Sequence, residues 1–190
     1  MSEQFDEIFD VLVIGSGCGG LTAALTADIS NPAKVLVIEK SHLIGGTSAT
    51  SGGVIWIPDN HLGKEKGAQD SISEAKDYLK ATIPADEFNE PLIDAYLDQG
   101  PKMVKFMQDH TDARYTSLEH YPDYFQDAPG VKLGNRALEP LPVSADVLGD
   151  DVDNLHPSGP QTIVFGRYGV NFEESHAFTT QSPGWFRLFA

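Results

Sequence analysis

The sequence predicts an α/β fold that opens with a Rossmann-like βαβ core and continues into helical and irregular segments. Two short apolar runs, FDVLVI at 9–14 and KVLVIE at 34–39, are rich in β-branched residues and typical of strands buried on both faces of a parallel sheet. Between them, 20–29 carries an apolar face at helical spacing and ends before Ser-Asn-Pro at 30–32. Strand, helix and strand fit the length of one βαβ unit, which predicts a right-handed crossover.

Helix signals continue in the middle of the chain. Ser71 and Glu74 stand at the spacing of a capping box, which predicts a helix from about Asp70 to Thr82. Pro91 suits the first turn of a second helix, which Gly100-Pro101 is expected to end.

The second half of the chain shows weaker patterns. A third helix is expected over 101–109, followed by loop-like sequence over 111–160 that is rich in Pro, Asp and Gly. Only 162–165 resembles a strand there. We therefore divide the chain into the start of a cofactor domain at 1–60 and a helical, loop-rich region at 61–190. The last residues are apolar and lack a cap, so that second region is expected to be incomplete.

Composition excludes several classes of protein. The 190 residues include 13 basic and 28 acidic side chains, and a formal charge of -15 repels phosphate backbones and anionic lipids. No nucleic-acid partner is therefore expected. A single cysteine cannot form an internal disulfide, and no apolar run reaches the length of a membrane span. With acidic residues before the first apolar run, the chain is expected to be cytoplasmic.

The first chemical motif is a G-x-G-x-x-G between the first strand and the first helix. Glycines in this context allow a tight turn, close approach of the backbone to a pyrophosphate, and close packing of the helix on the strand. The free N–H groups at the helix start would then hold the phosphates. The cofactor-binding residues expected in this motif are Gly15, Ser16, Gly17, Gly19 and Gly20. The alternative is that the glycines only make a tight turn.

An acid ends the second strand, where dinucleotide-binding folds use one to bind the adenosine ribose. Glu39 lies 19 residues past Gly20 and is expected to accept hydrogen bonds from ribose hydroxyls. An acid at this position favours an unphosphorylated ribose, so the cofactor is NAD or FAD and not NADP.

A second glycine-rich segment follows that acid. Its two Gly-Gly pairs permit close backbone approach, and its hydroxyls can donate to phosphate or ring oxygens of an extended cofactor. The alternative is a flexible surface loop. The cofactor-binding residues expected here are Lys40, Gly46, Thr47, Ser48, Ser51, Gly52 and Gly53.

These motifs together resemble a known family. DVLVIGSGCGG, VIEK and GGTSATSGGVIWIP are similar to the flavoproteins that include fumarate reductases and, most closely, the 3-ketosteroid Δ1-dehydrogenases. YPDYF at 121–125 and GNR at 134–136 also resemble the latter family. The resemblance is strong over 9–60 and moderate over 115–140.

The resemblance implies FAD and a dehydrogenation of an apolar 3-ketosteroid. In that family a tyrosine pair removes a proton from C2, the hydride from C1 passes to flavin N5, and an external acceptor reoxidises the flavin. Tyr124 matches the tyrosine that assists the proton-abstracting partner. A phenol can relay a proton in an apolar pocket where a carboxylate would be costly to bury. The competing interpretation is that Tyr121 and Tyr124 are only a packed pair of side chains in a loop.

Departures from the wider superfamily refine these expectations. Gly46 precedes Thr47 where covalent flavoproteins have a histidine, so FAD is expected to be non-covalent. The partner tyrosine and other parts of the active site have no counterpart here, and they are expected in a missing C-terminal part, which a separate chain could supply.

Metal and pocket residues give weaker signals. The histidines form no ligand pattern, and no metal site is expected. An apolar pocket could include Trp56, Phe125, Phe165 and Trp185, although core packing explains these aromatics equally well.

Two other functions stay open. One is an inactive nucleotide-binding module. The other is a fumarate- or urocanate-reductase-like enzyme, whose substrate clamp would have to use Arg114, Arg136, Arg167 or Arg187.

Overall fold

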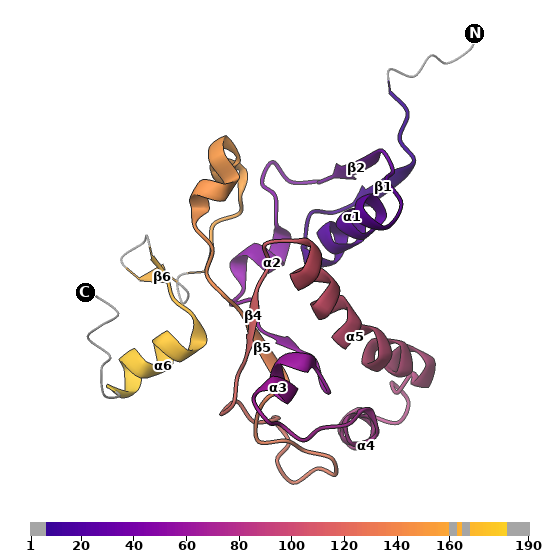
Figure 1. Cartoon of the computed structure of the whole chain (residues 1–190), viewed down its shortest axis with the longest axis vertical. Helices are drawn as coiled ribbons and strands as arrows, with labels where there is room; N and C mark the ends of the chain where they lie inside the picture. Colours follow the sequence, from indigo (N-terminus) through magenta and orange to yellow (C-terminus); the bar gives the residue numbers. More distant parts are fainter. Residues whose placement is uncertain (1–6, 160–162, 165–167, 182–190) are drawn as a thin grey trace. The chain divides into compact units, whose positions relative to one another are not determined.

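A computed structural model describes residues 7–159, 163–164 and 168–181 of the chain. These residues form two compact units (Figure 1). Unit 1 comprises the described residues within Met1–Gly52 and Val143–Val170, and unit 2 those within Gly53–Pro142 and Asn171–Ala190. None of the described helices is both long and apolar enough to cross a membrane.

Unit 1 is built on the βαβ arrangement that the sequence predicts. Strands β1 (Val11–Ile14) and β2 (Val35–Ile38) pair in parallel, with Val11 opposite Val35, and helix α1 (Cys18–Ser30) connects them. The prediction of strand, helix and strand is confirmed. The helix begins two residues earlier than expected, because the glycines of the motif already adopt helical geometry from Cys18 onward.

The remaining elements of unit 1 are short. Helix α2 (Gly46–Thr50) lies inside the second glycine-rich segment, so the alternative interpretation of that segment as a surface loop is wrong for these residues. The 3₁₀ segment η1 spans Ala145–Asn154, and strands β6 (Ile163–Val164) and β7 (Tyr168–Gly169) pair antiparallel.

Unit 2 contains a three-stranded antiparallel sheet in the order β3-β5-β4. The strands are β3 (Ile55–Trp56), β4 (Tyr115–Ser117) and β5 (Ala137–Pro140). The expectation of loop structure over 111–160 is wrong for β4, β5 and η1. Each strand is too short for a local pattern, and pairing over long sequence separations makes it a strand.

Four helices complete unit 2. They are α3 (His61–Glu65), α4 (Ile72–Thr82), α5 (Glu90–His110) and α6 (Phe172–Thr180). Helix α4 begins at the predicted cap, where the Ser71 hydroxyl accepts the Glu74 N–H and donates to its carboxylate. It lies against the first turns of α5, where Lys76 pairs with Glu90 and Asp94.

Helix α5 runs without interruption through Pro101, so the two separate helices expected over 91–109 are wrong. Leu97, Val104 and Met107 are buried on both sides of the proline, and their burial holds one continuous helix. Val104 packs with Ile57 and Leu138 of the sheet in the core of the unit.

Candidate functional site

The glycine motif of unit 1 makes a turn that only glycine fits at two positions. Gly15 has a φ of +98°, in the left-handed region that side chains rarely adopt. A Cβ at Gly20 would lie 2.0 Å from the Gly15 carbonyl oxygen. The close packing expected of these two glycines is therefore present.

The two glycine-rich segments meet at the start of α1. The Cys18 N–H donates to the Ser48 hydroxyl at 3.0 Å. A Cβ placed on Gly46 would lie 4.0 Å from the Gly17 Cα. Gly17, the N-cap residue, has no side chain to cap the helix, and a Cβ at Gly19 would meet nothing within 4 Å. The backbone here is therefore open to an approaching anionic group.

Glu39 is fixed at the end of β2 by the first motif. Its Oε2 accepts the Ser16 hydroxyl at 2.7 Å and the Ser16 N–H at 2.9 Å, and its Oε1 accepts the Ser41 N–H at 3.0 Å. These bonds, the Ser16 hydroxyl first, lower the pKa of Glu39 from 4.5 to about 2. The carboxylate is therefore ionised at neutral pH, as an acceptor of ribose hydroxyls must be.

The other predicted cofactor residues divide between the units. Lys40 is exposed shortly after β2, and Thr47, Ser51 and Gly52 are exposed within or directly after α2. Gly53 belongs to unit 2, where its φ of +75° and a 2.7 Å approach of Pro140 Cγ to an added Cβ both require glycine. The role of Gly53 in the fold is thus local packing against β5.

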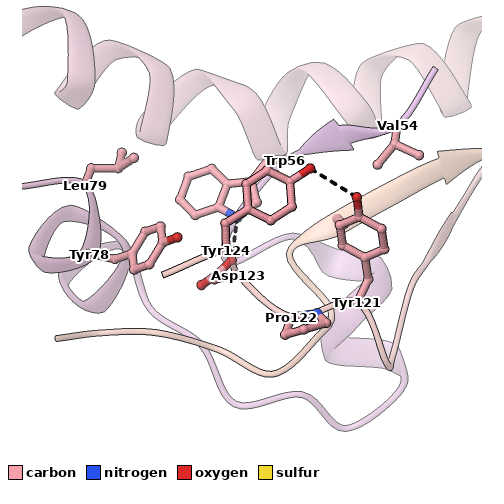
Figure 2. Close-up of a pocket in the computed structure, with 9 residues that line it drawn as sticks. Val54, Trp56, Tyr78, Leu79, Tyr121, Pro122, Asp123 and Tyr124 are labelled. Carbon is pink, nitrogen blue, oxygen red and sulfur yellow. Dashed lines mark hydrogen bonds between the residues drawn. The ribbon is translucent and has the colours of Figure 1, made fainter. Parts of the chain in front are cut away.

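Unit 2 carries a pocket walled largely by aromatic rings (Figure 2). Its volume is about 280 Å³, close to the lower end of small-molecule sites at roughly 300 Å³. Phe125 does not line it, and Phe165 and Trp185 lie outside the described residues. The lining residues are Val54, Trp56, Tyr78, Leu79, Tyr121, Pro122, Asp123, Tyr124 and Ala137.

A buried ionic network supports the wall of this pocket. Asp123 accepts the Trp56 indole N–H at 2.7 Å, and its other oxygen accepts from Arg136 at 2.8 Å. Arg136, only 1% exposed, also makes two bonds to Asp70 and lies over the Trp56 ring. Burial raises the pKa of Asp70, but bonds from Arg136 and the Asp59 N–H outweigh it and hold the pKa below 3.8.

Sequence reasoning did not find this network. Arg136 is 66 residues from Asp70 and 13 residues from Asp123 in the sequence. Partners at such separations leave no periodic signal. The Pro-Asp-Tyr and Asn-Arg motifs contain Asp123 and Arg136, but nothing in them shows that the two are paired.

Tyr124 stands at the mouth of the pocket. Its side chain is 81% exposed, and its hydroxyl lies 3.2 Å from that of Tyr121. The structure thus brings together the two tyrosines of the YPDYF motif, with their hydroxyls directed at each other (Figure 2).

The arginines available for a substrate clamp are limited. Arg136 is buried and paired with two carboxylates, and Arg114 donates to the carbonyls of Thr111 and Ala113. Arg167 and Arg187 lie outside the described residues. Within the described part of the chain, no three His, Cys, Asp or Glu side chains gather in a group that could hold a metal ion.

The fold and the open glycine turn define a dinucleotide-binding class of protein, and a family comparison gives its cofactor. The model of the FAD binding domain matches residues 10–160. The chain therefore belongs to the FAD binding domain family, and the predicted choice of FAD is confirmed.

Individual relatives are more specific. The chain is 42% identical over 151 residues to the 3-oxosteroid 1-dehydrogenase of Mycobacterium tuberculosis (strain ATCC 25618 / H37Rv), covering 79% of this chain and 26% of the relative. It is 39% identical to the 4-oxocyclohexanecarboxylate 2-dehydrogenase of Sinomonas cyclohexanicum, covering 90% of this chain and 29% of the relative.

A solved structure agrees with these relatives. The 3-ketosteroid delta1-dehydrogenase from Sterolibacterium denitrificans, in complex with 1,4-androstadiene-3,17-dione, matches with a TM-score of 0.86 and 38% identity. The match covers 94% of this chain and 31% of that one. The resemblance to 3-ketosteroid dehydrogenases is thus confirmed, and the chain spans less than a third of the length of these proteins.

Proposed function

We propose that this chain provides the first FAD-binding segment and part of the substrate pocket of a dehydrogenase that introduces a 1,2 double bond into a 3-ketosteroid. The observation that carries the proposal is the structural match over 94% of the chain to a 3-ketosteroid delta1-dehydrogenase. The aromatic pocket of unit 2 supports it, since rings without free cations suit an apolar ligand.

The residues of unit 1 fit a non-covalent FAD. Gly17, Gly19 and Gly20 would receive the pyrophosphate at the start of α1, and the Glu39 carboxylate would accept the ribose hydroxyls. Ser16 orients Glu39, and Ser48 fixes the second glycine-rich segment beside the first.

The remaining predicted residues would contact FAD beyond its adenosine half. Thr47 and Ser51 offer exposed hydroxyls there, and no histidine occupies the position of a covalent link. We assign the same role to Lys40, Gly46, Gly52 and Gly53.

In the proposed reaction, the C2–H and C1–H bonds of the ketosteroid break and a C1=C2 double bond forms. FAD, when bound, supplies the acceptor for the hydride that leaves C1. The C2 proton goes to a base, and Tyr124 assists that transfer as a phenol at the pocket mouth. Trp56 and Tyr78 exclude water from the rings of the ketosteroid, while Asp123 holds the Trp56 indole in place.

The first experiment tests the cofactor. The purified 190-residue chain is mixed with FAD, and binding is followed by the quenching of flavin fluorescence. Glu39→Ala is expected to weaken binding at least tenfold, because it removes the ribose acceptor and the partner of Ser16. Asp150→Ala, an exposed acid on η1, is the matched control and should bind as the wild type does. A wild-type chain that takes up no FAD under any condition contradicts the proposal that the residues of unit 1 bind FAD within these 190 residues.

The second experiment tests the substrate. The DNA beyond codon 190 is read first, and any continuing frame is expressed as one protein and loaded with FAD. Bleaching of the flavin by a 3-ketosteroid is the expected result. Bleaching by 4-oxocyclohexanecarboxylate alone would transfer the proposal to that ketone class. Reoxidation of reduced flavin by a fumarate-like acid would favour the reductase alternative, for which Arg136 is already saturated by Asp70 and Asp123.

A further inference from the structure

The two tyrosines at the pocket mouth differ in their surroundings. Tyr124 is 81% exposed, whereas the Tyr121 ring is half-buried. The Tyr121 and Phe172 rings pack in an edge-on arrangement, with their centroids 4.9 Å apart. Phe172 in turn stacks on His176 in α6. The Tyr121 ring is therefore held by packing, and the Tyr124 ring is exposed at the pocket mouth.

This asymmetry determines which hydroxyl keeps its proton. The hydrogen bond with Tyr124, followed by burial and the Tyr124 charge, raises the pKa of Tyr121 above 10.0. The half-buried tyrosine is thus the donor of the pair.

We propose that Tyr121 is a positioning residue, which donates its hydroxyl hydrogen to the Tyr124 oxygen and orients the exposed ring over the pocket. The hydrogen bond of 3.2 Å and the packing of Tyr121 on Phe172 carry this inference. Tyr121 keeps its own proton throughout. The consequence for catalysis rests on the proposed function, whereas the coupling between the two hydroxyls does not.

Other titratable groups face the pair from neighbouring elements. Asp123 is bonded to Trp56 and Arg136, the Tyr78 hydroxyl accepts the Phe125 N–H, and His176 stacks on Phe172. Glu139 accepts the N–H of Phe172, the residue whose ring contacts Tyr121. Tyr78 is one of six tyrosines and absorbs as Tyr121 and Tyr124 do, so the pair is isolated by subtracting the titration curves of single Tyr→Phe variants from that of the wild type.

The coupling between the Tyr121 and Tyr124 hydroxyls can be measured on the 190-residue chain without an enzyme assay. Near-ultraviolet absorbance is followed between neutral and strongly alkaline pH for the wild type, Tyr121→Phe, Tyr124→Phe and Tyr96→Phe. In Tyr124→Phe, the pKa of Tyr121 is expected to fall toward 10.0, because both the hydrogen bond and the neighbouring charge disappear. Tyr96 bonds to the Trp56 carbonyl and lies outside the pair, so its variant should only remove one phenol.

Additive titration curves would overturn the proposal. If Tyr121→Phe and Tyr124→Phe each subtract one phenol and leave the remaining curve unchanged, the hydroxyls are not coupled. Far-ultraviolet circular dichroism checks that each variant is folded.

The kinetic consequence is tested on the flavin-loaded protein from the complete reading frame. Tyr121→Phe is expected to lower kcat about tenfold and to change the pH profile, with KM changed less than about twofold. An unchanged pH profile would contradict the positioning role. If the wild-type protein oxidises no ring ketone, the proposed function fails, and the optical titration still decides whether Tyr121 and Tyr124 are coupled.

Discussion

Glu39 connects the first glycine motif to the end of β2 through a single carboxylate. Its pKa of about 2 lies below the ordinary 4.5, so the folded chain binds fewer protons than the unfolded chain. The stabilisation is complete above about pH 4.5 and is lost as the pH falls toward 2. Glu39→Gln should therefore destabilise the chain more at pH 7 than at pH 3, measured by urea unfolding at both. Equal destabilisation at both pH values would contradict the lowered pKa, and Asp150→Asn is the control.

Gly20 and Gly19 are adjacent in α1 but differ in the space around them. A Cβ at Gly20 would collide with the Gly15 carbonyl oxygen at 2.0 Å, whereas one at Gly19 meets nothing within 4 Å. Gly20→Ala is expected to lower the free energy of unfolding by about 1–3 kcal/mol or more. Gly19→Ala should leave it unchanged or raise it by up to about 1 kcal/mol, since alanine favours the helix. Urea unfolding of the two variants tests the difference, and equal effects would contradict the close packing of Gly20 on Gly15.

At the scale of the element, helix α4 depends on its predicted cap. The Ser71 hydroxyl accepts a hydrogen bond from the Glu74 N–H and donates one to the Glu74 carboxylate. The same carboxylate also pairs with Lys132. Ser71→Ala should cost about 1 kcal/mol of unfolding free energy, as the loss of an N-cap does elsewhere. Ser73→Ala, at an exposed position of the same helix, should change it by less than about 0.5 kcal/mol. A similar loss in both variants would show that the cap adds nothing.

The elements show which parts of the fold can be predicted from the sequence. The βαβ unit and α4 were predictable because apolar runs, a glycine turn and a capping box are local signals. Helix α5 was not, since the burial of Leu97 and Val104 outweighs the local cost of Pro101. Strands β4 and β5 depend on pairing across about twenty residues, which no local pattern records.

The candidate site divides in the same way. Its glycines and Glu39 were predictable because they stand at fixed spacings within one βαβ unit. The pocket wall was not, because Trp56, Asp123 and Arg136 come from segments far apart in the chain and meet only through the sheet of unit 2.

At the scale of the whole molecule, the two proposed ligands should leave separate footprints. The proposed FAD contacts belong to unit 1 apart from Gly53, and the aromatic pocket belongs to unit 2. In short hydrogen-exchange pulses, FAD should slow amide exchange most over 15–20 and 39–48. A 3-ketosteroid should slow it most over 54–56 and 121–124, where its rings would displace water from Trp56 and Tyr124.

ADP separates the cofactor halves within the same measurement. It carries the pyrophosphate and ribose that the first glycine motif and Glu39 would bind, so it should reproduce the protection over 15–20. It lacks the flavin, so protection that FAD adds beyond ADP marks the segment that contacts the ring system. We expect that added protection over 46–53, because the hydroxyls of α2 follow the adenosine site in the chain. Identical footprints for ADP and FAD would remove the second glycine-rich segment from the cofactor site and leave Glu39 and the first motif as its only supports.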